Sequence, residues 1–323
     1  IRCGTHHIQT VTKHKRIEKM TIKHYLLITL FLSTVTSFAQ ENNNELISDN
    51  LYFGQNPPGM TPGIFAPGII STEEFEFSGT FSMDGKEYFF TRRPSYESSE
   101  NKIFYTQLLN NKWTEPILAP FAKNTFEFEP VMSPTENKVY FYSERNESRD
   151  DRYDGDLWVS EKTGSGWGEA LYFLSLVNKK WCMSVSPSKT GTLYFSSNYE
   201  GKRGIFKAEI ENGQYPEVEY LSEEINSNFY SHPYIAPDES YIIMDGQPTG
   251  RGKPELFISF KKTNGEWTSP KNMGTKINAT KTEFGASVSP DGKYLFFHRR
   301  VNGKGDIYWV DAKIIDELKK DKK

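Results

Sequence analysis

A segment of one pattern recurs five times in this chain, about fifty residues apart. The copies are anchored at Ser82, Ser133, Ser186, Ala236 and Ser289, which are 51, 53, 50 and 53 residues apart. In each copy an alternating apolar strand ends at a tight turn, and an aromatic strand follows. Several short strands repeating every ~40–50 residues are typical of a β-propeller. The repeat therefore predicts an all-β chain whose blades surround a common axis.

Each copy contains the signals of a four-stranded blade. In the fifth copy the turn at Asp291 and Gly292 leads to an aromatic strand at Tyr294–Phe297, and a third strand is predicted at Asp306–Val310. We expect Gly85 and Gly292 to adopt positive φ, as a tight hairpin requires. Aromatic strands that are apolar on both faces fit blades packed between neighbouring blades.

The N-terminal part of the chain is predicted to close the ring. The fifth copy lacks an outer strand, whereas the apolar segment Ile64–Ile70 precedes the first copy without a partner. We expect Ile64–Ile70 to pair beside Asp306–Val310, because closure removes an open sheet edge. The result is five four-stranded blades. Six blades remain the alternative if Glu45–Gln55 supplies further strands.

Four segments follow from this organisation. They are an upstream and signal-peptide segment at 1–39, an N-terminal extension at 40–60, the β-propeller at 61–311 and a short C-terminal helix or tail at 312–323. Within the first segment, a short basic stretch from Met20 precedes the apolar run Tyr25–Val35 and the small residues of Ser37–Ala39, as in an export signal. The apolar run is well short of the ~20 residues that span a bilayer. We expect an exported protein, periplasmic or extracellular, without a membrane anchor.

Charge and cysteine content narrow the possible partners. Residues 1–39 carry six of the 39 basic and one of the 42 acidic side chains, so the remainder has a formal net charge of about −8. Nucleic acid is not an expected partner, because its phosphates are bound by a basic surface. Cys182 is the only cysteine after this segment, so no intramolecular disulfide can form, and we expect its side chain to be buried.

The residues Ser289 to Phe297, followed by Asp306, Ile307 and Tyr308, resemble the repeat of the TolB-like, WD40-like propeller proteins of bacteria. The resemblance covers about Phe75 to Asp311. It is specific because the pattern of Ser-Pro-Asp-Gly-Lys with a following aromatic strand is repeated, although Ala236, Asn137 and Ser240 depart from it. The resemblance implies an exported propeller used for binding or assembly.

The sequence contains no motif of a familiar catalytic centre. The Gly-x-Ser-x-Gly, His-Glu-x-x-His and phosphate-loop patterns are absent. After residue 39 only His232 and His298 remain, which argues against a histidine-rich metal site. We expect no metal and no cofactor.

Polar residues recur at two positions of the first strand of each copy, where a propeller has its central channel. Six residues before the anchors lie Glu76, Glu127, Lys180, Tyr230 and Glu283. Four residues before the anchors lie Ser78, Glu129, Cys182, His232 and Gly285. Arginines at the ends of three second strands are expected on the same face; they are Arg92, Arg145 and Arg299.

We therefore expect a ligand site at the channel mouth. Its predicted residues are Glu76, Glu127, Glu129, Tyr230, His232, Glu283, Arg92, Arg145 and Arg299. Guanidinium groups suit carboxylates and acidic sugars. The alternative interpretation is that the arginines simply pair with the channel carboxylates.

The sequence favours a monomeric, exported, non-catalytic binding or scaffold propeller. Its ligand would be a protein, a peptide or a glycan held at the channel face. The alternative is a glycan-active hydrolase of the five-bladed type. Such an enzyme needs two carboxyl groups ~5–10 Å apart, and neither may be neutralised by a cation.

Overall fold

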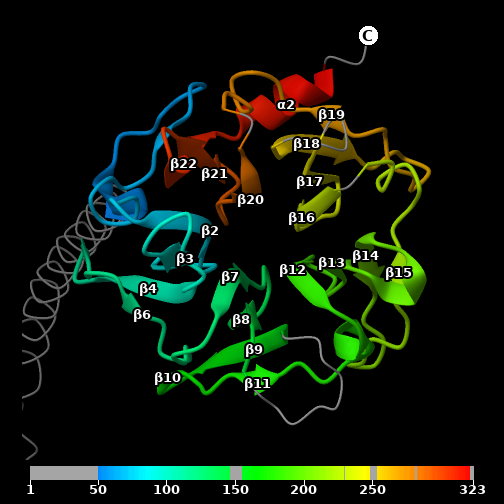
Figure 1. The fold of residues 1–323 in the computed structure, drawn as a ribbon, viewed down its shortest axis with the longest axis horizontal. Coiled ribbons are helices and arrows are strands. Elements are labelled where there is room, and N and C mark those ends of the chain that lie inside the picture. Colours follow the sequence, from blue (N-terminus) through cyan, green and yellow to red (C-terminus); the bar gives the residue numbers. More distant parts are fainter. Residues whose placement is uncertain (1–49, 146–154, 229, 248–252, 281, 321–323) are drawn as a thin grey trace, which may run out of the picture. The chain divides into compact units, whose positions relative to one another are not determined.

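Five antiparallel sheets surround a common axis in the computed structural model (Figure 1). The structure describes residues 50–145, 155–228, 230–247, 253–280 and 282–320. Residues 52–323 form one unit, which is the propeller. The prediction of an all-β, five-bladed propeller is confirmed. The expected leader at 1–39 lies outside the described residues.

In every blade the first three strands follow one another as consecutive hairpins. The innermost strands are β2 (Phe75–Phe81), β7 (Glu127–Met132), β12 (Cys182–Pro187), β16 (Tyr230–Ile235) and β20 (Phe284–Val288). The second strands are β3 (Glu87–Arg93), β8 (Lys138–Ser143), β13 (Leu193–Ser197), β17 (Tyr241–Gly246) and β21 (Tyr294–Val301). The third strands are β4 (Lys102–Leu109), β9 (Asp156–Thr163), β14 (Gly204–Ala208), β18 (Glu255–Phe260) and β22 (Lys304–Asp311).

The outer strands are short, as edge strands commonly are. We number the blades 1 to 5 in chain order, so that blade 1 contains β2 and blade 5 contains β20. In blades 1 and 2 the outer strand is divided into two pieces, which are β5 (Lys112–Trp113) with β6 (Ile117–Leu118) and β10 (Gly166–Trp167) with β11 (Leu171–Tyr172). Blades 3 and 4 use β15 (Glu219–Tyr220) and β19 (Lys271–Asn272). After β22 the chain forms the helix α2 (Lys313–Lys320), and 3-10 turns occur at Leu51–Gly54, Leu176–Lys179 and Tyr199–Gly201.

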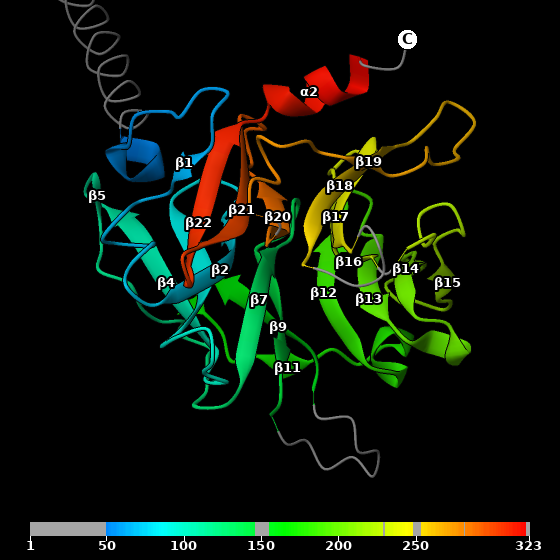
Figure 2. The ribbon, with the colours of Figure 1, turned by 45° about the horizontal axis from the view of Figure 1, so that its top comes forward.

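Blade 5 takes its outer strand from the N-terminal side of the chain. The strand β1 (Gly63–Ile64) runs antiparallel to β22, with Gly63 opposite Trp309. Figure 2 shows the order β1, β22, β21, β20 from the outside of this blade to the axis. The expected strand Ile64–Ile70 is shorter than predicted, because the chain turns at Ala66, whose carbonyl accepts hydrogen bonds from Ile69 and Ile70.

The hydrophobic core is divided into wedges between adjacent blades. Five clusters of buried residues each combine side chains from two neighbouring blades, and together they cover all five interfaces of the ring. This arrangement explains why the second strands are apolar on both faces. Gly85 and Gly292 have φ of 69° and 73°, which confirms the predicted hairpins.

The wedge between blades 5 and 1 contains the residues that close the ring. Phe65 follows β1 and is fully buried. Its ring centroid lies 4.9 Å from that of Phe296, 5.3 Å from that of Trp309 and 5.4 Å from that of Tyr88. The closure therefore depends on aromatic packing as well as on two residues of backbone pairing.

A repeated asparagine, not predicted from the sequence, joins consecutive blades. It precedes the innermost strand of blades 3, 4 and 5, where the residues are Asn178, Asn226 and Asn278. Each side-chain amide bonds both the N–H and the C=O of one third-strand residue in the preceding blade, at 2.8–3.0 Å. The residues held in this way are Leu157, Ile205 and Leu256.

Replacing Phe65 with Ala should lower the free energy of unfolding by about 3–5 kcal/mol, since truncating a fully buried aromatic side chain leaves a cavity. Ile64→Ala, at the adjacent residue in β1, is the matched control because Ile64 is 38% exposed. Its cost should be about 1 kcal/mol or less. Equal losses in urea unfolding would contradict the role of Phe65 in closing the ring.

Candidate functional site

Every innermost strand contains one β-bulge. The pairing with the second strand shifts register after Phe77, Phe128, Met183, Ser231 and Phe284. The next residue in each strand has a left-handed backbone, and these residues are Ser78, Glu129, Ser184, His232 and Gly285, with φ between 46° and 62°. Such a conformation is uncommon for residues other than glycine. Bulges often occur beside functional sites, where they redirect a side chain.

The third repeat has a different register from the one predicted. Its hairpin is closed by the Ser188 N–H, which donates to Thr192 O, whereas in the first repeat the Ser82 N–H donates to Glu87 O. Ser188, and not Ser186, is therefore the equivalent of the other anchors. The sequence comparison was wrong here because this hairpin is one residue shorter and Ser186-Pro187 imitates the anchor motif. Lys180 consequently lies outside the innermost strand.

The corrected register assigns new roles to two residues. Cys182 takes the position held by Glu76, Glu127 and Glu283 in other blades, and Ser184 takes the bulge position. Cys182 is buried, and burial raises the pKa of its thiol.

Three of the predicted site glutamates are fully buried, and each forms an ion pair with a predicted site arginine. Glu76 accepts from Arg92 Nε at 2.9 Å, Glu127 from Arg145 Nε at 2.6 Å and Glu283 from Arg299 Nε at 3.1 Å. Burial raises the pKa of Glu76, opposed by hydrogen bonds from Thr72 and by the charge of Arg92.

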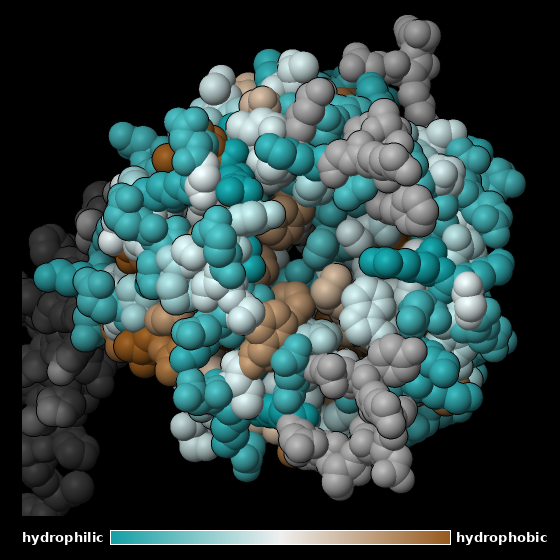
Figure 3. All heavy atoms as spheres, viewed as in Figure 1, coloured by the Kyte–Doolittle hydropathy of each residue, from teal (hydrophilic) through white to brown (hydrophobic). Residues whose placement is uncertain are grey.

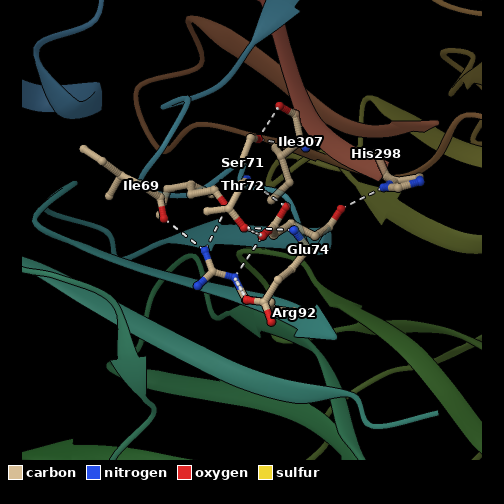
Figure 4. A network of polar contacts seen from close by, with 9 residues as sticks. Ile69, Ser71, Thr72, Glu74, Arg92, His298 and Ile307 are labelled. Atoms are coloured by element: carbon tan, nitrogen blue, oxygen red, sulfur yellow. Dashed lines mark hydrogen bonds and ion pairs between the residues drawn. The ribbon is translucent and has the colours of Figure 1, made fainter. Parts of the chain in front are cut away.

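In blades 1, 2 and 5 the paired arginine also holds the segment that leads into the blade, through hydrogen bonds to its backbone. Arg92 also donates to the carbonyls of Ile69 and Ile70 (Figure 4), and Arg299 donates to the carbonyls of Lys276 and Ile277. Arg145 makes the same type of bond to Phe121 O. The six side chains therefore stabilise the fold through their contacts with one another and with the backbone. This arrangement corresponds to the alternative interpretation, in which the arginines pair with the carboxylates. None of them lines the channel cavity described below.

Arg299→Met should lower the free energy of unfolding by about 3–5 kcal/mol, because it leaves the Glu283 carboxylate buried without its cation. Adding Glu283→Gln should recover part of this loss. The exposed pair Lys262–Glu266 supplies the control, and Lys262→Met should cost about 1 kcal/mol or less. If Arg299→Met costs no more than Lys262→Met in denaturant melts, the pair has no structural role.

A cavity of about 260 Å³ lies on the propeller axis, and all five blades contribute to its wall. The wall extends along each innermost strand from the bulge residue to the hairpin. Six prolines and several small aliphatic residues form much of it, and Lys189 and Met83 lie towards the hairpins. The polar groups at the bulge level include Ser78, Glu129, Ser184 and His232.

An aromatic cluster lies on the axis on the other side of the bulges. Phe77 contacts Phe128 and Phe284, with ring centroids 6.4 and 5.8 Å apart, so that blades 1, 2 and 5 meet there. Trp181 and Met183 of blade 3 pack against the same cluster and are partly exposed. One face of the propeller accordingly carries hydrophobic side chains around its central hollow (Figure 3). We use the name axial aromatic cluster for the five residues Phe77, Phe128, Phe284, Trp181 and Met183.

Glu129 and His232 meet across the axis, and their contacts connect all five blades. Glu129 Oε1 lies 3.1 Å from His232 Nε2, and Glu129 Oε2 accepts from Ser184 at 2.5 Å. His232 Nδ1 lies 2.8 Å from Asp245 Oδ1, which also accepts from the Gly285 N–H at 3.5 Å. The Glu129 N–H donates to Thr91 in blade 1. The result is a continuous polar chain at the level of the bulges.

The polar chain holds one imidazole between two carboxylates. Burial lowers the pKa of His232, but the charges of Asp245 and Glu129 and their hydrogen bonds outweigh it, so the pKa lies well above the usual value. With His232 protonated, the formal charges of Glu129, His232 and Asp245 sum to one negative charge. Only Glu129 and His232 of this trio reach the cavity wall, since Asp245 lies behind His232.

The two histidines of the propeller have opposite electrostatic environments. His298 is buried, and its Nδ1 bonds Glu76 O. Burial, assisted by the charges of Arg93 and Arg300 and opposed by that hydrogen bond, lowers its pKa to about 3. His298 is therefore neutral near pH 7, whereas His232 is protonated.

Stability should depend on pH through both histidines. The raised pKa of His232 stabilises the fold below the unfolded value of about 6.5, and this contribution is lost as pH rises through the folded value. The lowered pKa of His298 acts in the opposite direction, and its contribution is lost as pH falls from about 6.5 towards 3. Denaturant melts over pH should lose the alkaline slope in His232→Gln and the acidic slope in His298→Gln. Unchanged slopes would contradict these assignments.

The structure thus divides the nine predicted site residues into three groups, of which the first is the six residues of the buried glutamate–arginine pairs. Glu129 and His232 come together at the cavity, joined by Ser184 and Asp245, which the sequence did not single out. Tyr230 packs in the wedge between blades 3 and 4 and lies outside the cavity. Among the described residues, no group of three or more His, Cys, Asp or Glu side chains could hold a metal ion.

No family model and no curated protein matches the sequence. Solved structures similar to the chain include TolB from Acinetobacter baumannii, with 14% identity over 76% of this chain and 53% of that one, at a TM-score of 0.47. An endo-arabinase from Bacteroides thetaiotaomicron shares 13% identity over 76% and 94% of the two chains, at a TM-score of 0.48.

An oligogalacturonate lyase from Vibrio parahaemolyticus shares 14% identity over 75% and 67% of the two chains, at a TM-score of 0.41. The chain spans about half the length of the TolB structure. Similarities at this level assign no function, which therefore has to be argued from the residues of the chain itself.

Proposed function

We propose that this chain is an exported binding propeller whose axial cavity holds a small polar ligand, or the polar end of a protein, peptide or glycan. The observation that carries the proposal is the convergence of Glu129, Ser184 and His232 at one end of a cavity formed by all five blades. A concave site with a few convergent polar groups in a mainly apolar wall is typical of ligand binding.

The groups at the cavity favour binding over catalysis. A general base must be free to take a proton, but His232 is protonated and bonded at both ring nitrogens. Glycoside hydrolysis needs two facing carboxyls, and among the described residues of the cavity wall Glu129 is the single carboxylate. The three other predicted glutamates each have an arginine partner.

The charge at the floor of the cavity indicates the chemistry of the ligand. One net negative charge and several hydroxyl groups suit hydroxyl or ammonium donors better than anions. The proline and valine side chains of the wall suit a short apolar or ring-shaped body. The volume of about 260 Å³ admits a small molecule or one terminal group of a larger one.

Export rests on the sequence of residues 20–39, with its basic start, apolar run and small residues. None of the helices in the described part of the chain has the length and hydropathy needed to span a bilayer. A periplasmic or extracellular location fits a binding role for this propeller.

The test is a glycan-array and peptide-library screen of the full chain, followed by calorimetry on any ligand found. Glu129→Gln and His232→Gln should each weaken binding by about tenfold or more, because each removes a charged hydrogen-bonding group. Glu266→Gln, on the exposed surface, is the control and should bind like the parent protein. Unchanged affinity in both site variants would overturn the proposal, as would Glu129-dependent release of reducing sugar ends.

A further inference from the structure

Two arginines follow directly after the paired arginines Arg92 and Arg299. These are Arg93 at the end of β3 and Arg300 near the end of β21. Because neighbouring residues of a strand point to opposite sides of the sheet, Arg93 and Arg300 do not face the glutamates that pair with Arg92 and Arg299. Blades 1 and 5 are adjacent in the ring, so the two guanidinium groups lie in one region, on the side of the axial aromatic cluster.

Both guanidinium groups lie against the same exposed ring. Arg300 Cζ is 3.5 Å from the ring centroid of Tyr96, and Arg93 Cζ is 5.5 Å from it. Arg93 Cζ also lies 4.3 Å from the ring centroid of Phe75, which packs in the same hydrophobic cluster as Phe77. Tyr96 is 48% exposed, so solvent reaches this group of side chains.

Arg93 and Arg300 lack carboxylate partners of the kind that Arg92 and Arg299 have. Within the described residues neither forms an ion pair, and Arg93 Nε is buried without a hydrogen-bond acceptor. Arg93 Nη1 donates to Ser98 O at 3.3 Å, and Glu97 attracts Arg93 only through space. His298, next to them, is neutral. Two adjacent cations without a counter-ion repel each other, and an anion between them would relieve this repulsion.

We propose that Arg93 and Arg300 bind the carboxylate of a ligand whose ring or apolar part packs on the axial aromatic cluster. Arg300 Cζ lies 3.5 Å from the Tyr96 ring centroid, and a guanidinium group stacked on an aromatic ring keeps its N–H edge available for in-plane, bidentate bonds to a carboxylate. Arg93, whose Nε is buried and whose Nη1 donates to Ser98 O, adds its positive charge and its remaining N–H groups. The neighbouring Phe284, Trp181 and Met183 are partly exposed and offer the apolar surface. The negative net charge of the chain disfavours a polyanion.

This site is separate from the cavity. The cavity wall runs from the bulges towards the hairpins, whereas Arg93 and Arg300 lie at the opposite ends of the second strands. The carboxylate site would consequently bind independently of Glu129, and its failure would leave the proposed function of the cavity untouched.

The experiment compares two acids with their uncharged counterparts, using NMR or calorimetric titration of the full chain. The pairs are benzoate with benzyl alcohol and glucuronate with glucose. At least one acid should bind more tightly than its uncharged counterpart. The acid that binds shows whether an aromatic or a sugar ring is preferred. Binding of neither acid at millimolar concentration, or equal binding of acid and uncharged counterpart, would overturn the proposal.

Variants locate the binding. Arg93→Gln and Arg300→Gln should each weaken binding of the acid by about tenfold or more, which corresponds to the loss of a charged hydrogen bond. Lys112→Gln removes the same charge from an exposed position and should have no effect. Arg93 has a buried Nε whereas Arg300 has no such buried, unbonded atom, so Arg300→Gln keeps the test valid if Arg93→Gln fails to fold. Unchanged affinity in Arg300→Gln would refute the site.

Discussion

The closure of the ring is the constraint on which the rest of this structure depends. Each blade is apolar on both faces, so a blade is protected from water only when it has a neighbour on each side. Two residues of β1 complete blade 5 by pairing with β22, and the side chain of Phe65 packs in the last of these interfaces, between blades 5 and 1. Once the ring is closed, five innermost strands are forced together around one axis.

The convergence of these strands creates a place where polar groups from distant repeats can meet. Glu129 and His232 are more than a hundred residues apart in sequence, yet their side chains are in contact because their blades face one another across the channel. The bulge contributes as well, since a left-handed residue directs its side chain differently from its strand neighbours. Where the same strands point into the wedges, they are packed with hydrophobic residues.

The sequence predicted the architecture well because the relevant signals are local. Gly85 and Gly292 mark their hairpins, and the aromatic strands mark the wedges. The site was harder to predict because its contacts are between blades. Asp245 and Ser184 have no distinguishing sequence pattern, and the shorter hairpin after Ser188 displaced the alignment of the third repeat by two residues. The pairing of Glu76 with Arg92 could be anticipated only as an alternative, since pairing and ligand binding require the same residue types.

The ring is chemically uneven, and this has a consequence for how it opens. Blades 1, 2 and 5 each have a buried glutamate–arginine pair, whereas blades 3 and 4 have Cys182 and Tyr230 in the glutamate position, opposite Ser197 and Gly246. Their leading segments are held by neutral amide bonds of Asn178 and Asn226. Transient local opening should therefore begin at blades 3 and 4, and backbone amides there should exchange with solvent deuterium before those of the other three blades.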